Sequence, residues 1–380
     1  MKKNFDFDAL VDLCRRTHEH MQQSAARAAN TALAARNWLF GWYFVEYEQM
    51  GADRAEYGER LVDRLSRDLG SSGVTGTSPT NLRKFREFYR AYPQIQQTAS
   101  VKSLNHLFTD GSGIQQTPSV ESLVALAGSP DLPGRVFSIA AHFRLGWSHY
   151  VELMTIDNRD ERRFYEIEAA QNQWSVRELQ RQIASSLYER LALSRDKDEI
   201  KRLAREGQVV EKAADLIKNP LVLEFLGLPE HPHYSEQELE TAIIDKIESF
   251  LLELGKGFLF EARQKRFTFD NDHFFVDLVF YNRLLRCYVL IDLKREKLTH
   301  QDLGQMQMYV NYFDRYVKTD GELPTVGIVL CHRKNDSLVE LTLPKDANIF
   351  ASKYQLYLPS KEDLKHQLDL ATSALDEDKP

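Results

Sequence analysis

The sequence predicts an all-α N-terminal domain followed by an α/β C-terminal domain with a mixed central sheet. Two observations predict this division. In the first part of the chain, apolar residues recur at intervals of three and four, as in YGERLVDRLSRDLG, which is the period of amphipathic helices. Later in the chain, the runs GFLFEARQKRFTF, FFVDLVFY, CYVLIDLK and TVGIVLC are rich in β-branched and aromatic residues, as strands are.

Composition narrows the class of protein. The 380 residues are 43% hydrophobic and 28% charged, which is globular composition with length for two or three domains. No apolar run approaches the roughly 18 residues that cross a bilayer, and no signal-peptide pattern is present, so we expect a cytoplasmic protein without a membrane partner. The three cysteines are widely spaced and predict neither a disulfide framework nor a zinc site. With a net charge of −7, nucleic-acid binding would have to use local basic patches.

Domain limits are predicted where proline and glycine accumulate, between KDEIKRLAREG and NPLVLEFLGLPEHPHYS. We expect a helical domain at residues 1–205, with nucleic-acid or partner binding as its hypothetical role. A linker region follows at residues 206–234, and the α/β domain occupies residues 235–368. The acidic end at residues 369–380 is typical of a solvated tail.

Local signals predict the N-terminal helices. Helical periodicity covers Ala25–Leu69, and after a loop rich in Gly, Ser and Thr we expect Ser78 as an N-cap with Pro79 in the first turn. That helix should stop before Pro93. Residues 101–134 have weak periodicity and clusters of Gly, Ser and Pro, which predicts a long loop or an insertion.

Two capping boxes mark later helix starts. Ser175 and Glu178 form an S-x-x-E pair after a short turn, so the helices on either side resemble a helix-turn-helix arrangement. Ser235 and Glu238 repeat the pattern at the start of the C-terminal domain, in a helix that should end at Gly255. Three strands, a helix and a fourth strand follow, which is the order of an α/β or α+β unit.

Basic side chains on two helices are candidate nucleic-acid contacts. In NLRKFREFYRAYP the aromatic residues fall near one face, which predicts a core position, while the basic side chains point outward toward phosphates or solvent. The candidates here and after the tight turn are Arg83, Lys84, Arg86, Arg90, Arg177 and Arg181. A solvated helix face is the alternative interpretation for all of them.

One hairpin, VDLVFYNRLLRCYVLIDLKRE at residues 276–296, carries ionisable residues within apolar runs. Side chains alternate along a strand, so Asp292 and Lys294 share a face. If the hairpin folds symmetrically about Leu284 and Leu285, Asp277 lies opposite Asp292 with their Cβ atoms about 5 Å apart.

Two carboxylates that close repel each other unless a cation lies between them. Hard oxygen ligands are what Mg²⁺ prefers, so we expect Asp277 and Asp292 to bind Mg²⁺, with Mn²⁺ as an alternative. Such a metal lowers the pKa of bound water and stabilises charge on a phosphate, while Lys294 can orient the attacking water. The implied chemistry is phosphodiester hydrolysis, and solvated charges at the ends of strands are the alternative.

Asp277, about fourteen intervening residues and Asp292-Leu-Lys294 together resemble the PD-(D/E)XK nuclease signature. A later stretch strengthens this resemblance. In THQDLGQMQMYVNYF, Gln305 and Tyr309 lie at i and i+4 on one helix face, which looks like the Q-x-x-x-Y element of RecB-type members. The resemblance implies that both side chains belong to the active site.

These nucleases often place a further carboxylate near the metal, on the helix before the hairpin. The resemblance offers Glu248 for that role, with Glu253 as the second choice. Because the helix is dense in acidic residues, Glu240 and Asp245 stay open as alternatives.

The phrases GTSPTNLRKFREFYRAYP, LGWSHYVELM, WSVRELQRQI, LEFLGL and GQMQMYVNYF look like the YhcG-type family of bacterial PD-(D/E)XK nucleases. This likeness covers nearly the whole chain. It implies an all-helical N-terminal domain before a restriction-endonuclease-like C-terminal domain. The family's usual residue before Leu-Lys is Glu, whereas this chain has Asp292.

The prediction is a Mg²⁺-dependent nuclease that acts on DNA rather than RNA. A non-catalytic nucleic-acid-binding or assembly protein that keeps the fold is the first alternative. An RNA nuclease is the second, because nothing in the motif reads the sugar. By analogy, a homodimer would bring two sites to the two strands of a duplex. The candidate catalytic residues are Asp277, Asp292, Lys294, Gln305, Tyr309 and Glu248.

Overall fold

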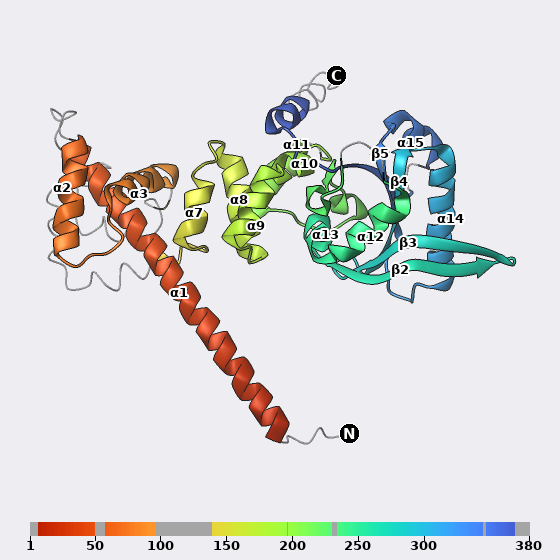
Figure 1. The fold of residues 1–380 in the computed structure, drawn as a ribbon, viewed down its shortest axis with the longest axis horizontal. Coiled ribbons are helices and arrows are strands. Elements are labelled where there is room, and N and C mark those ends of the chain that lie inside the picture. Colours follow the sequence, from red (N-terminus) through yellow and green to blue (C-terminus); the bar gives the residue numbers. More distant parts are fainter. Residues whose placement is uncertain are drawn as a thin grey trace, which may run out of the picture. The chain divides into compact units, whose positions relative to one another are not determined.

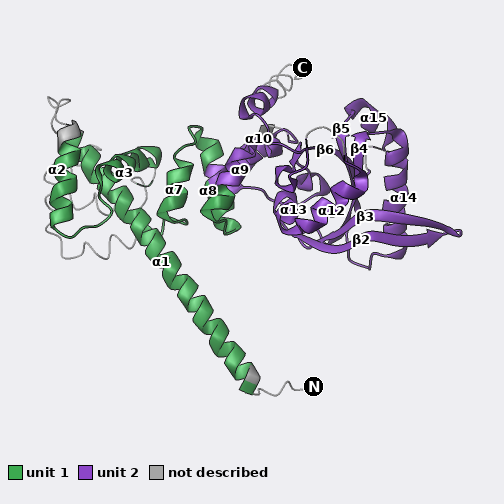
Figure 2. Ribbon diagram, viewed as in Figure 1, with its two compact units in different colours: residues 1–162, 166–179 green, residues 163–165, 180–380 purple. Residues whose placement is uncertain are grey.

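The computed structural model describes residues 7–49, 58–93, 95, 139–195, 197–229, 234–344 and 347–368. The chain forms two compact units, one of residues 1–162 and 166–179, the other of residues 163–165 and 180–380 (Figures 1 and 2). We call them the helical unit and the sheet unit. The predicted limits at residues 205 and 235 stay predictions, and the segment from residue 180 onward groups with the sheet. The predicted loop at 101–134 and the tail at 369–380 lie outside the described residues.

Local sequence signals predicted several of the helices in the first half of the chain. Ser78 caps its helix by accepting the Asn81 N–H at 3.3 Å, and Ser175 accepts the Glu178 N–H at 3.1 Å. The first helix begins at Phe7, well before the predicted start. The helices are α1 (Phe7–Gln49), α2 (Gly58–Ser71), α3 (Pro79–Ala91), α7 (Trp147–Leu153), α8 (Arg159–Gln171), α9 (Val176–Ala184), α10 (Leu187–Ala192) and α11 (Lys197–Glu206).

Aromatic side chains form much of the core of the helical unit. The rings of Trp38 in α1 and Tyr89 in α3 lie 5.3 Å apart, and Phe85 and Phe88 are buried as predicted. Gly41 allows this packing, because a Cβ atom there would lie 1.9 Å from the Phe85 carbonyl oxygen. The two helices therefore meet backbone to backbone at this point.

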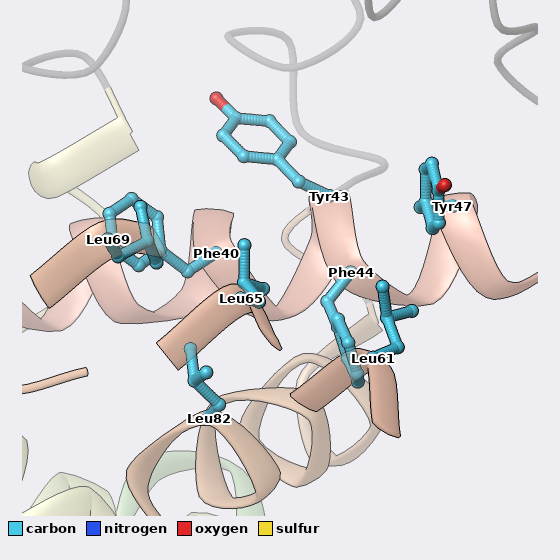
Figure 3. Close-up of a pocket in the computed structure, with 8 residues that line it drawn as sticks. All are labelled: Phe40, Tyr43, Phe44, Tyr47, Leu61, Leu65, Leu69 and Leu82. Carbon is cyan, nitrogen blue, oxygen red and sulfur yellow. The ribbon is translucent and has the colours of Figure 1, made fainter. Parts of the chain in front are cut away.

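An apolar hollow of about 300 Å³ lies between α1 and α2 (Figure 3). Phe40 and Phe44 of α1 line one side, and Leu61 and Leu65 of α2 line the other. Both leucines are half-buried, so the helical unit covers the apolar face of α2 only in part.

The sheet unit contains a mixed sheet with the strand order β1-β6-β5-β4-β3-β2. The strands β2, β3 and β4 are antiparallel neighbours, while β4, β5, β6 and β1 run parallel to one another. The predicted mixed sheet is confirmed, and β1 and β6 are strands that the sequence did not predict. The strands are β1 (Leu221–Val222), β2 (Phe258–Phe269), β3 (Asp272–Asn282), β4 (Cys287–Lys297), β5 (Val326–Arg333) and β6 (Ile349–Gln355).

Helices cover both faces of this sheet (Figure 1). The predicted helix before β2 begins at the Ser235 and Glu238 capping box and ends at Gly255, but Lys246 divides it in two. The 3₁₀ helices η4 (Ala213–Leu216) and η5 (Glu224–Leu226) precede it. The α-helices are α12 (Glu236–Asp245), α13 (Ile247–Leu254), α14 (His300–Tyr316) and α15 (Asp336–Thr342), and residues 361–368 are also helical.

Each face of the sheet has its own apolar core. On one face, Phe250 of α13 packs with Leu278 and Ile291. On the other, Met306 of α14 belongs to a separate cluster, and α14 approaches β5 closely at Gly327. A Cβ atom on Gly327 would lie 2.6 Å from the Met306 side chain, so this glycine sets how near α14 lies to the sheet.

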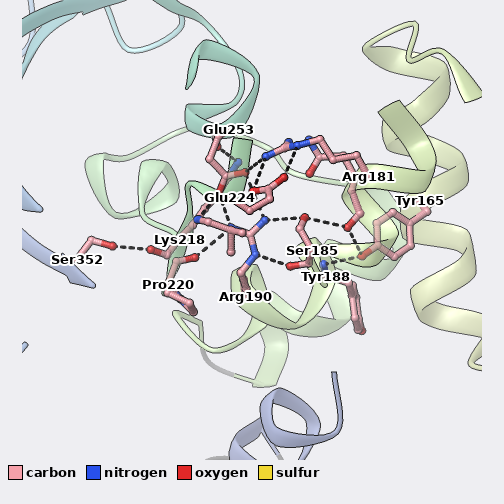
Figure 4. Close-up of polar contacts among 12 residues, drawn as sticks. Tyr165, Arg181, Ser185, Tyr188, Arg190, Lys218, Pro220, Glu224, Glu253 and Ser352 are labelled. Atoms are coloured by element: carbon pink, nitrogen blue, oxygen red, sulfur yellow. Dashed lines mark hydrogen bonds and ion pairs between the residues drawn. The ribbon is translucent and has the colours of Figure 1, made fainter. Parts of the chain in front are cut away.

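A buried ionic network joins α9 and α10 to the sheet (Figure 4). Arg190 and Glu253 form an ion pair in which both side chains are 0% exposed. Glu253 also accepts the backbone N–H of Val222 at 3.0 Å, and Arg181 lies 3.4 Å from its other oxygen. Burial alone would raise the pKa of Glu253, but Arg190, Lys218 and Arg181 together lower it to about 2. These contacts make Glu253 a structural anion.

We expect Glu253→Gln to lower the free energy of unfolding of the sheet unit by about 3–5 kcal/mol, because it leaves a buried guanidinium unpaired. Far-UV circular dichroism in guanidinium would show an earlier transition. Tryptophan fluorescence should change little, since all four tryptophans precede residue 175. The effect should persist above about pH 5 and shrink as the pH falls toward the depressed pKa of about 2.

Glu248→Gln is the matched control, because Glu248 lies exposed on the same helix. It should change stability by less than about 0.5 kcal/mol. Equal transitions for both variants would refute the assigned role of Glu253.

Candidate active site

The register of β3 and β4 sets the site. Leu278 pairs with Ile291, and Asn282 pairs with Cys287, so the hairpin is centred on Leu284 and Leu285, the arrangement on which the expected pairing of Asp277 with Asp292 depended. The regular ladder ends one pair before Asp277.

Asp277 continues where the ladder ends. Its Oδ2 atom accepts the backbone N–H of Leu293 at 2.8 Å. A side-chain oxygen thus takes the place of a backbone carbonyl between the two strands. This hydrogen bond fixes the Asp277 carboxylate against β4, at the residue that follows Asp292 in the sequence.

Asp292 and Lys294 lie on the α14 face of β4, since Leu290 of the same face belongs to the cluster of α14. The Asp292 residue is only 2% exposed. Its Oδ2 atom lies 2.8 Å from the Lys294 Nζ atom, and Asp302 of α14 is 4.0 Å from the same ammonium. Burial chiefly, and then the neighbouring Asp277, raises the pKa of Asp292 to about 7 against the attraction of Lys294.

The same environment shifts the pKa of the other two groups. Burial raises the pKa of Asp277, although its bond from Leu293 opposes the rise. Burial alone would lower the pKa of Lys294, but the Asp292 carboxylate holds it above its usual value. Two carboxylates that both resist ionisation beside one ammonium form a site suited to an additional cation.

These residues fit a divalent cation that prefers oxygen ligands. Asp292 Oδ2 is buried and, despite the nearby ammonium, has no well-directed hydrogen bond within the described part of the chain. No group of three or more His, Cys, Asp or Glu side chains there is arranged to hold a metal. A cation at Asp277 and Asp292 would therefore complete its shell with main-chain oxygens or water, as Mg²⁺ commonly does.

The carboxylate that α12 and α13 bring to Asp277, through Gln264, is Glu240, whereas Glu248 was the predicted choice. Gln264 of β2 donates to both Glu240 (2.6 Å) and Asp277 (3.0 Å) and so links them. Glu248 is exposed, and Glu253 is bound to Arg190. Neither of the two named candidates has a contact with Asp277 or Asp292 among the interactions of the described residues.

Gln264 was not predicted as a site residue. It lies inside the strand-like run EARQKRF, and its backbone takes a φ of 47° beside an irregularity in the pairing of β2 with β3. A glutamine among the basic residues Arg263, Lys265 and Arg266 gives no sequence signal for this backbone conformation, so only the fold brings it to the site.

Gln305 and Tyr309 lie together as the helical spacing predicted. Gln305 Nε2 donates to the Tyr309 hydroxyl, and Tyr309 is 1% exposed. Burial raises the pKa of Tyr309, and the charges of Asp292 and Asp277 add to the rise. The tyrosine is therefore within electrostatic reach of both carboxylates.

Comparison with known proteins agrees with this geometry. A family model described as the YhcG PDDEXK nuclease domain matches residues 214–369, and one described as the DUF1016 N-terminal domain matches residues 14–190. An Escherichia coli K12 protein named "Putative nuclease YhcG" is 38% identical over 365 residues, which cover 94% of this chain and 93% of that protein. The chain belongs to the YhcG family.

Two solved endonucleases also align with this YhcG family member, each over 35% of the chain. A repair endonuclease from Pyrococcus abyssi is 19% identical with a TM-score of 0.24, and EndoMS with double-stranded DNA is 18% identical with a TM-score of 0.23. The alignments span 50% and 48% of those chains.

In this member of the YhcG family the site opens into a hollow of about 380 Å³. Lys294, Thr299 and Asp302 line it together with Glu236, while Asp292 lies buried behind the ammonium. Lys294 therefore lies between the Asp292 carboxylate and the surface. None of the described helices is both long enough and apolar enough to cross a membrane.

The residues predicted to contact nucleic acid differ in their exposure and in the carboxylates near them. Arg181 pairs with Glu224 at 3.0 Å and with Glu253, so it is part of the internal network instead of a phosphate contact. Arg86 pairs with Glu48 at 3.2 Å. Arg90 and Arg177 are exposed, while Arg83 and Lys84 are half-buried, and their binding role stays a prediction.

We expect Asp292→Asn to raise the free energy of unfolding by about 0.5–2 kcal/mol in EDTA at pH 8, because it removes a buried carboxylate that the neighbouring Asp277 carboxylate repels. A urea titration of wild type and variant would measure the difference. Glu296→Gln, at a side chain that is 75% exposed, should stay within about 0.5 kcal/mol of wild type. A variant less stable than wild type would contradict the inferred repulsion between the Asp292 and Asp277 carboxylates.

Proposed function

We propose that this protein is a Mg²⁺-dependent nuclease that hydrolyses phosphodiester bonds, with Mn²⁺ as a substitute metal. One observation carries the proposal: the buried Asp292 and the half-buried Asp277 lie beside the Lys294 ammonium, which lines an open hollow. Such an arrangement is costly unless a cation and an anion bind there.

The residues would divide the work as follows. Asp277 and Asp292 would hold the metal, which supplies Lewis-acid activation of water and of the phosphate. Lys294 Nζ, held 2.8 Å from Asp292, would orient the attacking water and balance the negative charge of the phosphate. Glu240, through Gln264, would keep Asp277 in place, while Gln305 and Tyr309 would face the same phosphate from α14.

DNA is the proposed substrate because the Gln305 and Tyr309 pair resembles an element of RecB-type nucleases. The signature itself contains no group that reads the sugar, so RNA is the alternative substrate. A non-catalytic nucleic-acid-binding protein is the alternative from another class. A test with both polymers and with site variants separates all three.

Purified protein with Mg²⁺ should nick or linearise supercoiled plasmid, and Asp292→Ala and Lys294→Ala should each lower the rate at least about 100-fold. Gel electrophoresis of timed samples, with a single-stranded RNA in parallel, measures both substrates. Glu240→Gln should slow cutting, whereas the exposed Glu248→Gln should leave it unchanged. Wild type that cuts neither polymer faster than the Lys294 variant would sink the enzyme interpretation.

We also propose a homodimer that forms through the first half of α1. In heptad positions a and d, the second half of α1 presents Ala35, Trp38, Trp42 and Val45, all of them buried. The same two positions continue toward the N-terminus as uncharged residues, first the half-buried Thr31 and then the exposed Ala28, Ser24, Met21, Thr17, Cys14, Leu10 and Phe7. A stripe of uncharged a and d residues that is buried at one end of a helix and exposed to solvent at the other is suited to form a coiled coil.

The charges of this half-helix favour a second copy as the partner. Asp12, Arg15, Arg16 and Glu19 all fall on the outer positions b, c and f, and they pair within the helix. Arg27, the exception, donates to Gln173 of its own unit. Two identical stripes can therefore meet without bringing like charges together.

Light scattering should give wild type a mass near twice the 44.0 kDa of one chain. Leu10→Glu with Met21→Glu should shift it to the monomer, because the substitutions place charges on the stripe. Gln22→Glu with Gln23→Glu adds the same charge on the outer face and should stay dimeric. If the first pair stays dimeric or wild type is monomeric, α1 is not the dimer contact.

A further inference from the structure

A second hollow, of about 510 Å³, lies where β5 and β6 end. Basic side chains line it, and among its lining residues Asp336 alone is acidic. Asp336 lies 2.7 Å from Lys334 and neutralises that one ammonium. Three further basic residues at the hollow are His332, Arg333 and Lys353. No hydrogen bond or ion pair involves the Arg333 guanidinium or the Lys353 ammonium among the contacts of the described residues.

Strand register ties this hollow to the candidate active site. Lys294 of β4 is level with Cys331 of β5, and Cys331 is level with Lys353 of β6. Residues level with one another in neighbouring strands point to the same face. Lys294 and Lys353 are thus in one row on the α14 face, two strands apart, or about 10 Å between Cα atoms.

Arg333 lies close to the same row. It is level with Lys297, whose side chain lines the hollow beside Lys294. Because β4, β5 and β6 are parallel, their carboxyl ends meet at one edge of the sheet, which is where α/β sheets commonly bind ligands. The basic hollow and the candidate active site are therefore neighbours along one edge.

The electrostatics of the hollow favour an anion. Burial lowers the pKa of His332, and the charges of Arg333 and Lys353 lower it further, so both cations act on this imidazole. His332 Nδ1 is buried without a hydrogen-bond partner in the described part of the chain. Like charges gathered without counter-charges repel, and an anion with several acceptor oxygens would relieve that repulsion.

We propose that Arg333 and Lys353 bind a backbone phosphate of the nucleic-acid strand whose scissile phosphate lies at Lys294. The proposal rests on the proposed function. At a rise of about 3.4 Å per nucleotide, the row spans roughly three nucleotides of one strand. Arg333 can contact two phosphate oxygens at once, and Lys353 adds a point charge. The hollow then fixes which phosphate reaches the carboxylates.

The test is fluorescence anisotropy with labelled DNA and RNA duplexes and single strands, in EDTA so that no cutting occurs. Arg333→Ala with Lys353→Ala should weaken binding of the preferred polymer at least about tenfold at 0.1 M salt. The dependence of log K on log salt should lose about one to two in slope, since each phosphate contact contributes about 0.9.

Matched controls separate a local contact from net charge. Arg283→Ala with Lys246→Ala removes the same charge at exposed positions, Arg283 in the hairpin turn and Lys246 between α12 and α13, and should bind within about twofold of wild type. Arg333→Lys with Lys353→Arg keeps the charge and should retain most of the affinity, which guards against a folding defect.

The outcomes distinguish this proposal from the nuclease proposal. Wild type that binds but does not cut with Mg²⁺ would refute the nuclease alone, and the loss of binding in the alanine pair would still support the phosphate contact. Wild type that cuts, with an alanine pair that binds with unchanged affinity and slope, would overturn the phosphate contact alone. No binding of DNA or RNA by wild type would overturn it as well.

Discussion

The site depends on the hydrogen bond from the Leu293 N–H to the Asp277 carboxylate. Up to Ile291, β4 pairs with β3 in antiparallel fashion, and from Val289 onward it also pairs with β5 in parallel. Where the ladder of β3 ends, Asp277 supplies the acceptor that the backbone no longer provides. The bond holds the two strands at a fixed separation and brings Asp277 to β4 in the row of Asp292. Without that acceptor the Leu293 N–H would be buried and unpaired, at a cost of about 1–3 kcal/mol.

The arrangement of the residues at the centre of the candidate site could be predicted from the sequence, because the signals there are local. The apolar alternation around Leu284 and Leu285 predicts the register, since a shift of one residue would turn Ile291 and Leu293 out of the core. The i and i+4 spacing predicts that Gln305 and Tyr309 meet. Glu238 at the first turn of α12 and Gly255 after α13 are likewise read from neighbouring residues.

The helix carboxylate could not be predicted, because its position depends on the break at Lys246. In a continuous helix from Glu236, the helical period alone would predict which residues share a face, so the positions of Glu240 and Glu248 could be compared from their spacing. The break at Lys246 changes which side the later residues face. Glu240 therefore contacts Gln264, while Glu248 is exposed. The ion pairs of Arg181 could not be predicted for a related reason. Its partners Glu224 and Glu253 are 43 and 72 residues away along the chain, a separation at which the sequence gives no signal.

Charge is separated along the sheet, which reconciles the acidic chain with the nucleic-acid substrate that we propose. The carboxylates of Asp277 and Asp292 lie together on β3 and β4, where a metal could balance them. Uncompensated cations gather at the ends of β5 and β6, where phosphates could balance them. Lys294 lies between the two regions. Asp292, one methylene shorter than the family's usual Glu, keeps its carboxylate close to the backbone of β4. The nucleic-acid strand must therefore approach β4 closely, and cations at the ends of β5 and β6 that hold it on one side of the cut become more valuable.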